Sequence, residues 1–123
     1  MPLDDFLQQL RSSPESIEFE AVMTLIESMY DFTPTAFRNG ALHNTAGRNT
    51  GSCKLFAFAR RHGLSEGETL ACFGRHYRED VLLHPDADSH ANIRNFMLSC
   101  WTGISFEKNP LAEKQGARRQ APG

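Results

Sequence analysis

The stretch from Arg38 to Lys54 constrains the fold most, because it is long, polar and rich in glycine and asparagine. This composition suits neither a core strand nor a helix, and connections longer than about 12 residues in compact domains usually have a function or are disordered. Asparagine and glycine supply left-handed and Asx-turn backbone geometry, which favours an ordered loop over a flexible linker. The sequence therefore predicts a long ordered Asn/Gly-rich loop, and we expect any binding site there first.

The charge of the chain changes sign along its first half. Residues 1–31 carry seven acidic residues and one arginine, whereas residues 32–65 carry five basic residues and no acidic one. Two interpretations stay open: the two segments pack together and neutralise each other, or the basic segment binds an anion. A net charge of −2 over 123 residues does not indicate a nucleic-acid-binding domain.

Apolar side chains recur at helical spacing through most of the remaining chain. We predict a helix ending near Ser12, a second over 16–30 with Ser16 as N-cap, and a third over 52–62 with Ser52 as N-cap. A capping box of Ser65 and Glu68 opens a fourth helix that continues to about residue 81. A last helix begins at Asp88 or Ser89 and ends before Gly103, and residues 104–106 form a short extended piece.

The fold class that follows is mainly α: a single domain of four or five helices in residues 1–107, with one or two very short extended segments. Residues 108–123 contain one large apolar side chain, Leu111, so we predict a disordered C-terminal tail. Three cysteines without paired spacing predict free thiols and a reducing compartment. The N-terminus lacks a secretory signal pattern, and no apolar run is long enough to span a membrane.

Cys53 falls at the first position of the helix that Ser52 would cap, a place that lowers a thiol pKa. A small enzyme using Cys53 with His84 or His90 as base is therefore one alternative, although no protease or redox signature surrounds the cysteine. A second cluster, formed by His84, Asp86, Asp88 and His90, has the residue types of a metal site, but ordinary helix capping explains it better. We predict no catalytic residue, no metal and no cofactor.

Five strings taken together resemble one family, the HopJ type III effector family of bacteria. They are Phe32 to Gly40, Gly51 to Ala59, Leu70 to Leu82, His84-Pro85 and Asn92 to Met97. In this order and spacing they cover roughly residues 17–106. The resemblance implies a bacterial virulence protein without established catalysis, delivered into a host cell by a type III system. The acidic Asp4 and Asp5 depart from the acid-poor N-terminus that injected effectors usually carry.

These observations favour a small binding protein that engages an anionic ligand, or a host or bacterial protein partner, through its Asn/Gly-rich loop. We expect the bacterial cytoplasm or a host cell as its location, and neither a membrane nor nucleic acid as its partner. A stress-related protein of the bacterial cytoplasm is a further alternative. The predicted ligand-binding residues lie in the loop and in the 84–94 turn: Asn39, Asn44, Arg48, Asn49, Gly51, Ser52, Cys53, Lys54, His84, His90, Asn92 and Arg94.

Overall fold

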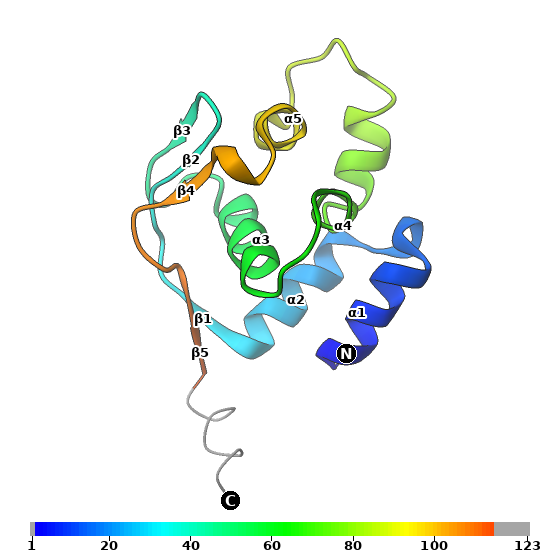
Figure 1. The fold of residues 1–123 in the computed structure, drawn as a ribbon, viewed down its shortest axis with the longest axis vertical. Coiled ribbons are helices and arrows are strands. Elements are labelled where there is room, and N and C mark those ends of the chain that lie inside the picture. Colours follow the sequence, from blue (N-terminus) through cyan, green and yellow to red (C-terminus); the bar gives the residue numbers. More distant parts are fainter. Residues whose placement is uncertain (1, 115–123) are drawn as a thin grey trace, which may run out of the picture.

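Five α-helices and five short strands make up most of the computed structural model, which describes residues 2–114 (Figure 1). The helices are α1 Leu3–Ser12, α2 Phe19–Met29, α3 Thr50–Arg61, α4 Glu66–Ala71 and α5 Ala91–Ser99. The strands are β1 Tyr30–Phe32, β2 Phe37–Asn39, β3 Leu42–Asn44, β4 Ile104–Phe106 and β5 Leu111–Glu113. Two 3₁₀ helices, η1 Pro14–Ser16 and η3 Trp101–Gly103, and a π-helix, η2 His76–Val81, complete the regular structure. Helices predominate, as predicted, but two small antiparallel sheets make the domain a mixed one.

Helix α3 runs through the centre of the domain. Its residues 55–59 are at most 7% exposed, so the helix is apolar around most of its circumference. Such a helix must be covered on several sides. Helix α2 packs on one side, α4 on another, and strand β5 contacts it as well (Figure 1).

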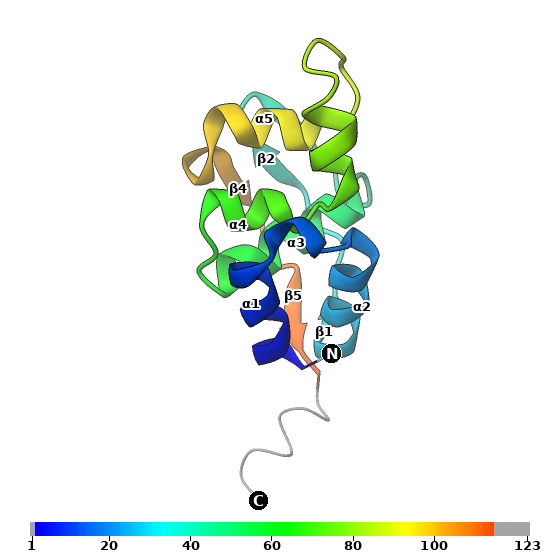
Figure 2. The same ribbon diagram turned by 90° about the vertical axis from the view of Figure 1, so that its right-hand side faces the viewer.

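The prediction of a long loop from Arg38 to Lys54 is wrong for its first part, because residues up to Asn44 belong to a β-hairpin. Strands β2 and β3 pair with Asn39 opposite Leu42, and Gly40 and Ala41 form the two-residue turn. Gly40 has a φ of +61°, which suits a glycine in a tight turn. β4 pairs with the other edge of β2, and helix α5 packs across β2 and β3 (Figure 2).

Several helix ends differ from the predicted ones. Helix α3 begins at Thr50 after Asn49, three residues before the start predicted with Ser52 as N-cap, so Cys53 is its fourth residue and not its first. Ser16 does not cap α2; its hydroxyl donates to the Ser13 carbonyl within η1, and α2 starts at Phe19. Helix α5 starts at Ala91, after the predicted Asp88 or Ser89. The predicted capping box of α4 is confirmed.

The long helix predicted from 66 to about 81 is interrupted at Gly74, whose φ is +60°. A Cβ atom at this position would lie 2.8 Å from the backbone nitrogen of Phe19 and 3.1 Å from the carbonyl oxygen of Ile17. Close approach to another segment and left-handed backbone both require glycine here. The chain therefore changes direction between α4 and η2.

The prediction of a disordered tail over residues 108–123 is wrong for residues 111–113, which form strand β5 and pair with β1. Leu111 is 1% exposed, and its carbonyl oxygen accepts a hydrogen bond from Arg61 Nη2 at 2.9 Å. Two buried neighbours, Pro110 and Leu111, and the backbone ladder with β1 thus order this polar segment. Residues 115–123 of the predicted tail lie outside the described residues.

The acidic segment 1–31 and the basic segment 32–65 do lie side by side. Helices α2 and α3 are packed together, and Lys54 Nζ lies 3.3 Å from Glu27 Oε2. All three cysteines are free, as predicted. In the described part of the chain, no helix combines the length and the apolar character that crossing a membrane would need.

Candidate functional site

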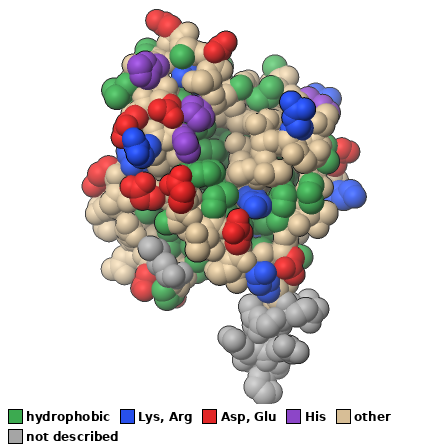
Figure 3. Space-filling model, turned by 180° about the vertical axis from the view of Figure 1, so that it is seen from behind, with side chains coloured by type: hydrophobic (Ala, Val, Ile, Leu, Met, Phe, Trp, Pro, Cys, Tyr) green, Lys and Arg blue, Asp and Glu red, His purple; other side chains and the backbone are tan. Residues whose placement is uncertain are grey.

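A pocket of about 400 Å³ opens where the start of α3, the start of α5 and the helix η2 meet. Apolar side chains supply part of its wall: Phe19, Leu42, Phe73 and Ile93. Polar residues from the two helix starts and from η2 supply the rest: Asn49, Ser52, His76, His90 and Asn92. Seen from behind, histidine side chains gather next to acidic ones and to apolar atoms (Figure 3). A pocket of this size with an apolar wall and a few polar groups suits a small organic ligand.

Two helix N-termini face this pocket, and both begin in an unusual way. Asn49 and His90, the residues before α3 and α5, have left-handed backbone with φ of 53°. No side chain among residues 2–114 caps the first turn of either helix. The N–H groups of a first turn have no partner within the helix and carry a partial positive charge. Each of the two helix starts therefore contributes a partial positive charge to the pocket wall.

A network of four asparagines holds the hairpin against the start of α5. The Oδ1 atom of Asn92 accepts hydrogen bonds from the Nδ2 atoms of Asn39 and Asn44, each at 3.1 Å. Asn44 Oδ1 accepts from Asn92 at 3.0 Å and from Asn49 at 2.7 Å. Asn39 also donates to the Asn92 carbonyl at 2.7 Å, while Asn39 Oδ1 is the one buried side-chain polar atom of the described chain without a partner. The network fixes the two helix starts relative to each other.

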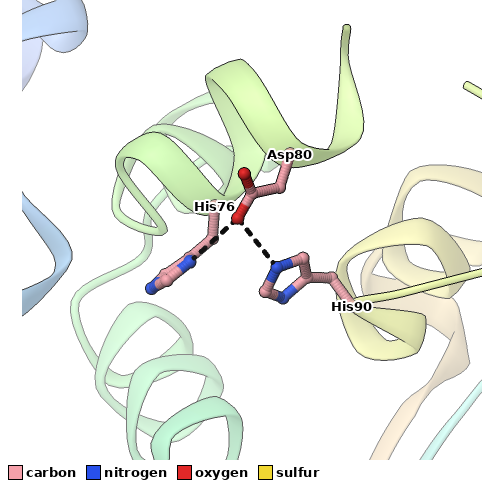
Figure 4. A group of neighbouring side chains, drawn as sticks. All are labelled: His76, Asp80 and His90. Carbon is pink, nitrogen blue, oxygen red and sulfur yellow. Dashed lines mark hydrogen bonds and ion pairs between the residues drawn. The ribbon is translucent and has the colours of Figure 1, made fainter. Parts of the chain in front are cut away.

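His76, Asp80 and His90 meet at the edge of the pocket (Figure 4). Asp80 Oδ2 lies 3.0 Å from His90 Nε2 and 3.5 Å from His76 Nδ1. Hydrogen bonds from His90 and His76 lower the pKa of Asp80 below its ordinary value. His76 and Asp80 come from η2 and His90 from the residue before α5, so the group exists only in the folded chain.

The model of the HopJ type III effector protein family matches residues 3–111 of this chain. The chain belongs to this family. Among solved structures, the crystal structure of an unknown function protein, VPA0580, is similar, with a TM-score of 0.91 and 58% sequence identity. That match covers 93% of this chain and 95% of the other. No curated protein matches the chain.

The predicted ligand-binding residues of this HopJ family member divide into two groups. The pocket wall contains Asn49, Gly51, Ser52, His90 and Asn92, and the asparagine network behind it contains Asn39 and Asn44. The remaining residues lie elsewhere: Arg48, Cys53, Lys54, His84 and Arg94 are not part of the pocket wall.

Two of the basic side chains, Lys54 and Arg94, have other contacts in the HopJ domain. Lys54 pairs with Glu27 and lies over the Phe32 ring, 5.0 Å from its centroid. Arg94 donates hydrogen bonds to three backbone carbonyls in 80–89, the shortest at 2.6 Å to Ser89. Arg94 therefore organises the turn that ends at His90.

The proposed nucleophile of the enzyme alternative is buried in the HopJ fold. The Cys53 side chain is 1% exposed, and its Sγ donates to the Thr35 carbonyl oxygen at 3.7 Å rather than to a histidine. Burial raises the pKa of the Cys53 thiol to about 11, the opposite of the predicted shift. A buried thiol that stays protonated is a poor nucleophile, so the structure does not support this alternative.

His76 and Asp80 were missing from the predicted site. The metal-type cluster expected from sequence was His84, Asp86, Asp88 and His90, but the structure groups only His90 with other ligand-type side chains. His84, Asp86 and Asp88 are exposed on the preceding turn. The spacing of four between His76 and Asp80 places both on one side of a helix and was the signal available in the sequence.

Proposed function

We propose that this HopJ family member is an effector-like small binding protein that takes a small organic anion in the pocket between α3, α5 and η2. The observation that carries the proposal is the convergence of two uncapped helix N-termini on one pocket with a partly apolar wall. Backbone N–H groups at a helix start bind phosphate and carboxylate groups. The apolar wall formed by Phe19, Phe73 and Ile93 suits the body of such a ligand.

A bare anion should bind weakly. Each helix end contributes about 0.3–1 kcal/mol toward an exposed anion, and a millimolar dissociation constant corresponds to about 4 kcal/mol. Two helix ends together supply at most about 2 kcal/mol, so we expect inorganic phosphate to bind only in the range of tens of millimolar and benzoate, which adds an apolar body, to bind more tightly. Anion titrations followed by backbone amide shifts of the full chain measure both.

Ser52 offers a pair of variants that separates charge from bulk. It is the third residue of α3, where glutamate is well tolerated because of the helix dipole. Ser52→Glu should abolish the shifts by placing a negative charge in the pocket wall, whereas Ser52→Gln, of equal size, should retain them. Amides at Gly51, Ser52 and Ala91 that stay unmoved in tens of millimolar phosphate and benzoate would refute the proposal.

The family description names type III effectors, and we propose that the chain is delivered into a recipient cell by that route. A fusion to a reporter that is active only inside the recipient cell tests this. The signal should appear with a secretion-competent strain and be absent with its secretion-deficient counterpart. A silent reporter in both strains would favour the alternative of a protein that acts in its own bacterial cytoplasm.

A second candidate function, binding of a partner protein, is favoured by four exposed apolar side chains: Leu82, Leu83, Met97 and Leu98. Leu98 is 84% exposed on α5, where a large apolar side chain contributes nothing to the core. The first partner to test is a second copy of the chain. Sedimentation velocity at rising concentration should show self-association that Leu98→Lys removes, and a monomer at every concentration would exclude this partner.

A further inference from the structure

We propose that His76, Asp80 and His90 form a binding site for a divalent transition metal ion, with Zn²⁺ as the best-fitting ion. Each of the three residues offers one ligand atom, and these atoms all lie within 4.8 Å of one another. Two ligand atoms bound to one zinc ion in tetrahedral geometry are about 3.4 Å apart. The distances of 3.0 and 3.5 Å from Asp80 Oδ2 to the two imidazole nitrogens are close to that value.

The ligand types select among metals. Two imidazoles and one carboxylate suit zinc, cobalt, nickel or iron, whereas magnesium and calcium prefer sites made of oxygen atoms alone. Three protein ligands leave at least one coordination position free, as in zinc sites that bind water or a substrate. His76 and His90 also belong to the pocket wall, so a ligand in the pocket would lie near that free position.

The backbone holds both ligand-bearing segments in uncommon conformations. His76 and Asp80 lie in the π-helix η2, and π-helical turns occur frequently at functional sites. His90 has left-handed backbone, which is uncommon outside glycine and costs free energy. Arg94 ties the two segments together, since its guanidinium donates to the Asp80 carbonyl at 3.3 Å and to the Pro85 carbonyl at 3.3 Å.

A simple ion pair between Asp80 and the histidines is the competing explanation. The side chains of His76, Asp80 and His90 are 37%, 52% and 32% exposed, and ion pairs this exposed contribute little to stability. Such a pair gives no reason for two uncommon backbone conformations to meet at one carboxylate. A metal ion does, because it requires all three ligand atoms at one point. A cation there would also offset the negative charge of Asp80 beside the proposed anion pocket.

Titration of the metal-free full chain with Zn²⁺ or Co²⁺ in phosphate-free buffer tests the site. Calorimetry should show one ion bound per chain with micromolar affinity, and Co²⁺ should give an absorption spectrum without thiolate bands. Asp80→Asn, which keeps the shape of an exposed side chain, should weaken binding about tenfold or more. His84→Gln is the matched control, because His84 is an exposed histidine of the same region outside the group, and it should bind as the wild type does.

Three results would overturn the metal site. The first is the absence of saturable binding below about millimolar Zn²⁺. The second is an equal loss of binding in His84→Gln and Asp80→Asn. The third is a Co²⁺ absorption spectrum with thiolate bands, which would indicate that cysteine binds the ion. Circular dichroism of each variant establishes that it is folded. The metal proposal stands independently of the anion proposal, because phosphate shifts in the metal-free chain and metal binding without phosphate are separate measurements.

Discussion

Replacing Leu111 with alanine should destabilise the domain by about 3 kcal/mol, although the residue lies in a segment that is polar by composition. Its side chain is 1% exposed in contact with the core, so the substitution removes nearly all of its buried surface. Burying a leucine contributes about 1.5–3 kcal/mol, and the cavity left by alanine raises the cost to about 2–5 kcal/mol. We expect the lower half of this range, because a short edge strand can move inward to fill part of the cavity.

Equilibrium unfolding in urea and thermal unfolding both measure this effect. For a domain of this size, 3 kcal/mol corresponds to a decrease in melting temperature of about 12 °C. Leu83→Ala is the matched control, since Leu83 is 68% exposed and its truncation should change stability by about 0.5 kcal/mol or less. If Leu111→Ala and Leu83→Ala unfold at the same urea concentration, β5 does not contribute to the core and our description of the C-terminal strand is wrong.

Three further predictions follow from features of the core. Asn92→Ala should cost about 2–3 kcal/mol in urea unfolding, because it removes three buried side-chain hydrogen bonds: the two that Asn92 Oδ1 accepts from Asn39 and Asn44, and the one that Asn92 donates to Asn44. Gly74→Ala should destabilise the domain by more than the roughly 1 kcal/mol expected for Gly63→Ala. Both glycines have positive φ, but only at Gly74 would the added Cβ atom lie against backbone atoms of another segment. Equal losses of stability in the two variants would contradict this. Burial and the charge of Arg61 lower the pKa of His62 in the folded chain. Below about pH 6.5 the unfolded state therefore binds more protons than the folded state, which lowers the free energy of unfolding. Stability should fall from pH 7 to pH 5 more steeply in the wild type than in His62→Gln.

Local signals predicted the parts of the fold that depend on neighbouring residues. The capping box of Ser65 and Glu68 and the helix ending near Ser12 are decided within one or two turns, and the structure contains both. The break at Gly74 is different, because its cause is the backbone of Phe19, more than 50 positions earlier. A periodic pattern that continues across Gly74 gives no sign of that contact.

The hairpin was predictable in principle, and composition concealed it. A glycine at the first position of a two-residue turn, here Gly40-Ala41, is a hairpin signal, but the flanking strands are only three residues long and partly polar. The burial of Asn39 and Asn44 depends on Asn92, which lies about 50 positions away. The site itself had the same limit: the spacing of His76 and Asp80 was visible in the sequence, while the approach of His90 required the folded domain.

The pairing of β1 with β5 has a consequence for how the chain is made. Lys114 and Asp31, at the end of this ribbon, are 83 positions apart, and β4 likewise joins a hairpin formed much earlier in the sequence. During translation, α1, α2 and α3 leave the ribosome before either late strand exists to complete the two sheets. Such long-range pairing slows folding, and it leaves the side of α3 that β5 contacts open to non-native contacts until β5 is available. Completion of both sheets is therefore a late event in synthesis, because β4 and β5 follow all five α-helices of the described chain.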